Sequence, residues 1–212
     1  MSPQAIPQLD PRAVKRAWIF MFALLAIYAW PFSILPRGRL GWLGLVHLLG
    51  FGAAHQAPLR GWILAAVVVA LFCAASMRSY QLIREHVFDW GTIKIAAIVF
   101  ALLSGIMEEV WFRLGIMNWA QAHGHGPAAQ VVYSALAFGA VHAVWGVAAR
   151  KFKVAIGSMI ATGLLGAALA LVYLASDRVV APCIWAHVVI NLIIEPWLLI
   201  AAMTRGLQTH VG

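Results

Sequence analysis

Long apolar segments dominate this sequence and limit it to a narrow class of folds. In lipid, every backbone polar group must be satisfied within the protein, so segments long enough to cross a bilayer are expected to be helices. A helix needs about 20 mainly apolar residues for this purpose. We therefore predict an all-α fold, a polytopic membrane helical bundle with about six transmembrane helices. The predicted spans are residues 17–35, 61–77, 92–120, 128–148, 154–175 and 180–203.

The composition agrees with an integral membrane protein and argues against a nucleic-acid partner. The chain is 63% hydrophobic and only 10% charged, which is far outside the usual range of soluble domains. The net charge of +8 comes from short basic clusters between apolar segments. Such clusters are typical of topology signals and of contact with anionic lipid headgroups. We interpret residues 17–35 as a retained span, because they contain Trp and Pro and lack a small-residue cleavage site.

The basic clusters also predict how the chain crosses the membrane. Because Lys and Arg favour the cytoplasmic side, we expect both termini there, with the loop AHGHGP (122–127) on the other side. The shorter apolar segment 40–54 is predicted to be an interfacial or re-entrant segment on that other side. We predict one domain, residues 1–212, with its motif-bearing core at about 92–203. The clusters are Arg12, Lys15 and Arg16; Arg78 and Arg84; and Arg150, Lys151 and Lys153.

Three charges interrupt the apolar segment around IMEEVWFR (106–113) and need an explanation. Glu109 and Arg113 are four residues apart, so they share a helix face and can form an intrahelical ion pair. We interpret that pair as structural, since it positions the helix and lowers the cost of burying both groups. Glu108 points about 100° away, on the face of Ser104 and Phe112, and must meet another helix or a trapped water.

Two other pairs of residues show the same spacing in later spans. Phe138 and His142 mark one face of the fourth span, and His187 and Asn191 mark one face of the last. With a rise of about 1.5 Å per residue, Glu108, His142, His187 and Asn191 lie roughly 12 to 21 Å deep, counted from the far side. Four polar residues from three helices are therefore expected to converge.

A carboxylate and two imidazoles around a water can activate it as a nucleophile, either directly or through a metal. The chemistry that this favours is hydrolysis. An attacked peptide carbonyl develops an oxyanion, which needs hydrogen-bond donors aimed at it. A ring N–H of His187 and the amide of Asn191 fit that second role.

Three short motifs carry a resemblance to a known family. EEVWFR (108–113) matches EExxxR, FGAVH (138–142) matches FxxxH, and HVVIN (187–191) matches HxxxN. Their order and their places in apolar spans resemble the CAAX protease and bacteriocin-processing family, also called the ABI family. The resemblance covers roughly residues 100–195.

The resemblance implies an intramembrane glutamic endopeptidase without a cofactor. Glu108 and His142 would activate water, while His187 and Asn191 would hold the oxyanion. The substrate would be a membrane-associated peptide or protein. The short chain favours a bacterial member and the bacterial inner membrane. The supporting residues would be Glu109, Arg113 and Phe138.

Two other hypotheses remain open at this point. The first is a zinc-dependent intramembrane protease that uses Glu108, His142 and His187 as metal ligands, because these residue types suit Zn²⁺. The second is a non-catalytic membrane protein, either an immunity factor that binds a peptide or a proton-coupled carrier, because buried acids also serve as proton relays.

Glu195 is a further acidic residue near this constellation. It lies four residues beyond Asn191 and directly before Pro196, which should kink the helix. A metal ligand or a proton path would explain it, but we favour an interfacial anchor.

Overall fold

The fold is entirely helical wherever the chain is described. The computed structural model describes residues 11–34, 46–47, 49–50, 56–149 and 151–203, and every regular element in these ranges is a helix. The predicted all-α class is therefore confirmed. Four helical segments are long and apolar enough to cross a membrane, and they are Leu59–Ser79, Thr92–Ala122, Pro127–Gly146 and Phe152–Ala175.

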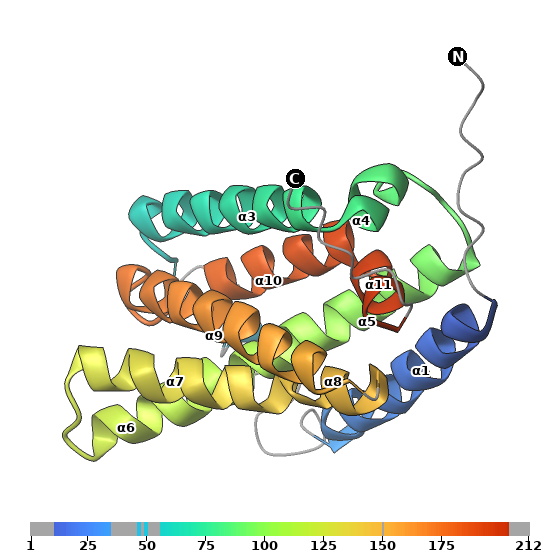
Figure 1. The fold of residues 1–212 in the computed structure, drawn as a ribbon. Coiled ribbons are helices and arrows are strands. Elements are labelled where there is room, and N and C mark those ends of the chain that lie inside the picture. The colour runs from blue at the N-terminus through green and yellow to red at the C-terminus, as the bar shows by residue number, and fades with distance from the viewer. Residues whose placement is uncertain (1–10, 35–45, 48, 51–55, 150, 204–212) are drawn as a thin grey trace.

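These four segments are built from most of the elements labelled in Figure 1. The second combines α5 (Thr92–Glu109), the π-helix η2 (Val110–Met117) and α6 (Asn118–Ala122). The others correspond to α3 (Leu59–Ser79), to α7 (Pro127–His142) with the start of α8 (Val144–Ala149), and to α9 (Phe152–Ala175). The remaining helices are α1 (Pro11–Ile34), α4 (Gln81–His86), α10 (Ala181–Ile194) and α11 (Trp197–Met203).

The last predicted span is not one continuous helix in the structure. Residues 180–203 divide into α10, a shorter apolar helix, and α11. The break falls at Pro196, as the missing N–H and the ring of a proline require. The first predicted span, residues 17–35, falls almost wholly within α1. Six spans therefore stay a prediction, and most of the expected segment 40–54 lies outside the described residues.

The ends of the helices agree with the alternation predicted from the basic clusters. Figure 1 shows the start of α1, the α3–α4 junction and the start of α9 at one end of the bundle. The loop between α6 and α7 lies at the opposite end. Arg12, Arg78 and Lys153 therefore mark the same end, whereas Arg150 is outside the described residues. Which end faces the cytoplasm stays a prediction.

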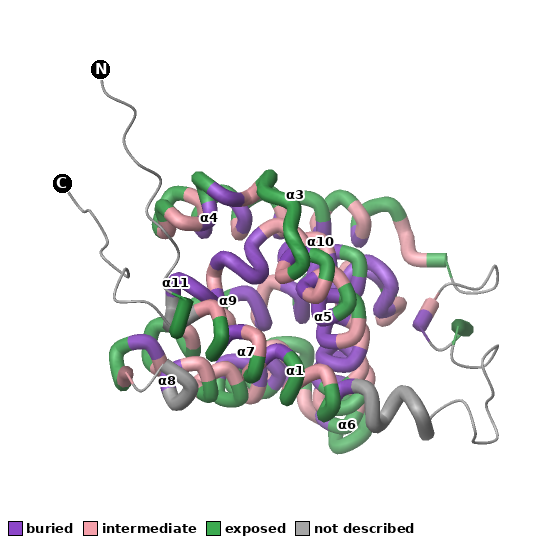
Figure 2. The backbone as a smooth tube through the Cα atoms, turned by 90° about the vertical axis from the view of Figure 1, so that its right-hand side faces the viewer, coloured by how far each residue is buried: buried purple, intermediate pink, exposed green. Residues whose placement is uncertain are grey.

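The outer surface of the bundle is apolar. Leu71 of α3, Leu136 of α7 and Leu164 of α9 are 67%, 67% and 68% exposed. Figure 2 shows exposed positions along the outer helices, whereas α10 contains a high proportion of buried positions. Large exposed apolar side chains on long apolar helices are suited to lipid. The chain is an integral membrane protein.

Small residues let the helices approach closely. A Cβ on Gly139 of α7 would lie 2.6 Å from the carbonyl oxygen of Met159 on α9. A Cβ on Gly105 of α5 would lie 2.7 Å from Cγ2 of Val188 on α10. Close backbone approach at small residues is a common way to pack membrane helices. The second contact lies beside Glu108 on one helix and His187 on the other.

Lys94 holds the far end of α10 against α5. It is 5% exposed, and Nζ donates hydrogen bonds to the backbone carbonyl of Leu192 and, at 2.7 Å, to that of Glu195. The last carbonyls of a helix lack partners within the helix, and a buried lysine can satisfy them. The break at Pro196 is thereby stabilised by a charge from α5.

Candidate active site

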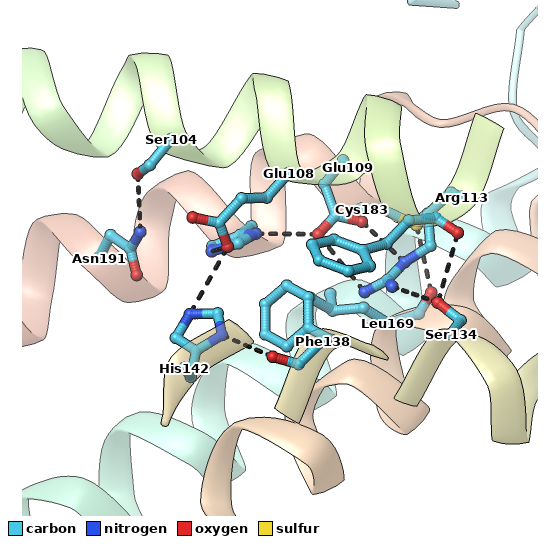
Figure 3. A network of polar contacts seen from close by, with 12 residues as sticks. Ser104, Glu108, Glu109, Arg113, Ser134, Phe138, His142, Leu169, Cys183 and Asn191 are labelled. Atoms are coloured by element: carbon cyan, nitrogen blue, oxygen red, sulfur yellow. Dashed lines mark hydrogen bonds and ion pairs between the residues drawn. The ribbon is translucent and has the colours of Figure 1, made fainter. Parts of the chain in front are cut away.

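Glu108 sits on the helix face that its sequence position predicts. Glu108, Ser104 and Phe112 are all buried, at 5%, 1% and 4% exposure. In Figure 3, Glu108 points from α5 toward His142, and Asn191 reaches Ser104 on the same helix. The predicted contact of this face with other helices is confirmed.

Glu109 and Arg113 form the predicted ion pair. Nε of Arg113 is 2.9 Å from Oε2 of Glu109, and neither side chain is exposed. Nη1 of Arg113 also donates a hydrogen bond of 2.7 Å to Oγ of Ser134 on α7. The pair therefore connects two helices, in addition to lowering the cost of burying each charge.

A π-helix begins directly after this acidic pair. The π-helix η2 covers Val110–Met117 and includes Arg113. Such wide turns are rare and are frequently found at functional sites. Sequence spacing alone did not indicate it, because the predicted pairing of Glu109 with Arg113 is the same in either type of turn.

His142 faces Glu108 with its Nε2 atom. Nδ1 of His142 is 2.7 Å from the carbonyl oxygen of Phe138, one turn earlier on α7. Because a carbonyl only accepts, Nδ1 carries a proton, and Nε2 of the neutral ring has a free lone pair. Nε2 lies 3.6 Å from Oε2 of Glu108. The ring is therefore held in the tautomer that a base requires.

His187 lies between the two adjacent glutamates. Its Nε2 atom is 3.8 Å from Oε2 of Glu108, and its Nδ1 atom is 2.8 Å from Oε1 of Glu109. A carboxylate that accepts from Nδ1–H stabilises the imidazolium form of the ring. In that form Nε2 also carries a proton and can donate it in a hydrogen bond.

Phe138 fills the space between the two histidines. Its ring centroid is 4.6 Å from that of His142 and 5.6 Å from that of His187, and the residue is fully buried. The Arg113 guanidinium lies 5.4 Å from the same ring. The predicted supporting role is reasonable on this packing, because displacement of the ring would release both imidazoles.

Asn191 lies one turn beyond His187 on α10. Its Nδ2 atom donates to Oγ of Ser104 at 3.3 Å, which is a long hydrogen bond. One amide hydrogen remains for another acceptor. The structure therefore brings all four predicted site residues to one region, since Glu108, His142, His187 and Asn191 line the same cavity.

That cavity has a volume of about 530 Å³ and extends well beyond the polar cluster. Its walls include apolar side chains of α1, α3 and α9, such as Ile27, Phe72 and Leu165. Lys153, on the first turn of α9, also lines it. A site of this kind can hold a largely apolar ligand against a few fixed polar groups.

A comparison with protein families covers the region that holds this cluster. A family model described as type II CAAX prenyl endopeptidase, Rce1-like, matches residues 90–193. These residues form an Rce1-like CAAX endopeptidase domain. A domain of this family implies a protease, and the family implies protein substrates. The chain matches no curated protein and no solved structure.

The Rce1-like region does not contain every residue of the site. Tyr28 of α1 lies outside residues 90–193, yet its hydroxyl donates a hydrogen bond to Oε1 of Glu108. Sequence analysis missed Tyr28, and it also missed Ser134 as the partner of Arg113. Neither has a charge or a motif around it, so only the folded arrangement identifies them.

The metal hypothesis receives no support from the arrangement of ligands. Among the described residues, no three or more His, Cys, Asp or Glu side chains are grouped so that they can hold a metal ion. Glu195 is not the interfacial anchor that we favoured, because it is 6% exposed and lines the cavity. Glu195 is buried beside Lys94, whose Nζ atom donates a hydrogen bond to the backbone carbonyl of Glu195.

Proposed function

We propose that this protein hydrolyses a peptide bond of a membrane-associated protein or peptide, with Glu108 and His142 activating the water. The observation that carries the proposal is the position of Oε2 of Glu108. This buried oxygen faces Nε2 of His142 at 3.6 Å and Nε2 of His187 at 3.8 Å. It has no hydrogen-bond partner among the described residues.

Both distances exceed a direct hydrogen bond, but a single water can contact an acceptor and a base across a gap of this size. Glu108 and Nε2 of His142 both accept hydrogen bonds from this water, and one proton passes to Glu108 as the water oxygen bonds to the peptide carbonyl carbon. The proton is later returned to the leaving amine. Because Glu108 and His187 are buried, few competing waters can reach these groups.

The oxyanion of the tetrahedral intermediate needs hydrogen-bond donors aimed at it. We assign this role to Nε2–H of protonated His187 and to the amide of Asn191. The contact between His187 and Glu109 supports the assignment, since an acceptor at Nδ1 favours the protonated ring. Glu109, Arg113 and Phe138 support the reacting groups from behind.

We propose a membrane-associated protein or peptide as the substrate because the cavity walls are largely apolar and the catalytic groups lie inside the bundle. We further propose that the chain forms one domain with six spans and that it lies in the bacterial inner membrane. The site favours a protease over a carrier or a scaffold. A scaffold does not need a histidine such as His142, which is held in the tautomer of a base and faces the carboxylate of Glu108.

A survey of protein termini tests this function. Membranes from cells that express wild type or Glu108→Gln at equal levels are compared by mass spectrometry. We expect at least one terminus that appears only with wild type. Glu85→Gln is the matched control, because Glu85 is exposed and bonds only Gln81 in the described part of the chain.

If the Glu108→Gln variant produced the same termini as wild type at the same rate, the hydrolytic mechanism would be wrong. Substrate flux in liposomes that contain the purified protein would instead support the carrier hypothesis.

A further inference from the structure

Tyr28 is a buried polar residue that contacts the reacting carboxylate from a distant part of the chain. It lies on α1, 80 residues before Glu108, and is 9% exposed. Its hydroxyl donates a hydrogen bond to Oε1 of Glu108. No other described residue makes a hydrogen bond to that carboxyl group.

The ring of Tyr28 is held by aromatic neighbours from the segment that carries Glu108. Its centroid is 6.1 Å from that of Phe100 on α5 and 5.8 Å from that of Trp111 on η2. Tilted aromatic contacts in this range are favourable beyond simple burial. Phe100 and Trp111 therefore fix the direction of the Tyr28 hydroxyl relative to α5.

The two oxygens of Glu108 consequently have different partners. Oε1 accepts from Tyr28, whereas Oε2 faces Nε2 of His142 and of His187. Without a donor on Oε1, the carboxylate can rotate about its terminal torsion, which is broad and roughly two-fold. The tyrosine thus selects one orientation, in which Oε2 points at both imidazoles.

We propose that Tyr28 is a positioning residue of the active site, which orients Glu108. The proposal rests on the hydrolytic function above. It makes α1 part of the catalytic unit, although α1 lies outside the Rce1-like region.

The test is Tyr28→Phe, which removes the hydroxyl and keeps the ring. Tyr173→Phe is the matched control, because Tyr173 is also buried and its hydroxyl donates to Asn118 at 3.0 Å, away from Glu108. The probe is a synthetic peptide that spans the cleavage site found by the survey of termini, incorporated into liposomes with the purified protein.

We expect kcat of Tyr28→Phe to fall about tenfold to a hundredfold, as for loss of a hydrogen bond to a charged group. KM should stay at the wild-type value, because the hydroxyl is bonded to Glu108 and not to the substrate. Tyr173→Phe should keep the wild-type kcat. The melting temperature in detergent measures how far each variant is folded.

A second measurement separates positioning from partial unfolding. Unfolded enzyme lowers the apparent kcat only in proportion to the unfolded fraction, whereas loss of the Tyr28 donor lowers kcat calculated per folded molecule. His142 of α7 and His187 of α10, which face Glu108, are unchanged in the variant. A low kcat per folded molecule would support the proposal even if Tyr28→Phe were less stable.

A wild-type kcat per folded molecule in Tyr28→Phe, with Glu108→Gln inactive, would overturn the positioning role and leave the hydrolytic function intact. A rise in KM alone would also overturn it, in favour of a role in binding. If Glu108→Gln cleaved the peptide like wild type, the hydrolytic function would fail and the role of Tyr28 with it.

Discussion

Oε1 of Glu109 lies 2.8 Å from Nδ1 of His187, so the second glutamate of the adjacent pair orients the histidine that the first one faces. The same carboxyl group pairs with Arg113 at 2.9 Å through its other oxygen. Helix spacing predicted that Glu109 positions its own helix, and the family resemblance implied a supporting role in the site. The contact with His187 gives that role a physical form, because it links the ion pair to the candidate active site.

Replacing Arg113 should test how much this buried charge pair contributes. Arg113→Met leaves Glu109 without its cation, and we expect the free energy of unfolding to fall by about 3–5 kcal/mol, the usual result of breaking a buried pair. The measurement is reversible denaturation in mixed micelles. Arg78→Met, at an exposed site, should match wild type.

The double variant Glu109→Gln/Arg113→Met removes the uncompensated charge. It should recover part of the lost stability, because a neutral pair of similar volume costs less to bury. A double variant less stable than Arg113→Met by the full cost of a second substitution would contradict this account.

The contact between Gly105 and Val188 predicts a steric effect on the site. A Cβ at position 105 would lie 2.7 Å from Cγ2 of Val188, next to His187. Gly105→Ala should therefore push α10 from α5, lower stability by about 1–3 kcal/mol and reduce kcat. At Gly157 a Cβ meets nothing within 4 Å, so Gly157→Ala is the matched stability control. Equal stability of the two variants would show that α10 can shift freely.

Asn191 has both a structural and a catalytic interpretation, and two variants separate them. If its amide holds the oxyanion, Asn191→Ala should lower kcat by about 10²- to 10³-fold. Ser104→Ala removes only the acceptor of its 3.3 Å hydrogen bond and should retain most of the activity. The measurement is the initial cleavage rate at saturating peptide. If the two variants lost activity to the same small extent, Asn191 would merely tie α10 to α5.

Metal content distinguishes the proposed mechanism from a zinc protease. We expect purified active enzyme to contain no stoichiometric zinc and to keep its cleavage rate after dialysis against a chelator. Elemental analysis and the peptide assay provide the two readouts. Stoichiometric zinc, with activity lost to the chelator and restored by added zinc, would establish the zinc mechanism instead.

The contacts and burial that depend on a single helix were predictable from the sequence. The four-residue spacing of Glu109 and Arg113 predicts their pairing, because helix geometry alone determines which side chains are neighbours. The burial of Glu108 on the face of Ser104 follows in the same way. The three motifs also predicted that Glu108, His142 and His187 meet.

Contacts that depend on how helices pack were not predictable. Tyr28 lies in an aromatic-rich segment where nothing distinguishes it from neighbouring residues, and its partner is 80 residues away. Lys94 binds backbone carbonyls, which leave no trace in the identity of Leu192 or Glu195. The break before Pro196 had a local signal, but hydropathy extends across it and suggested one long span.

The π-helix between Glu109 and Asn118 divides the long helical segment Thr92–Ala122 into two parts. Each part has its own rotation about the helix axis. An α-helix turns about 100° per residue, so a wide turn changes the direction of everything that follows it. The inner part directs Glu108 toward the histidines, while the outer part directs Asn118 toward Tyr173 and Arg178. Shortening this segment by one residue would put the two parts out of register, so its length matters as much as its composition.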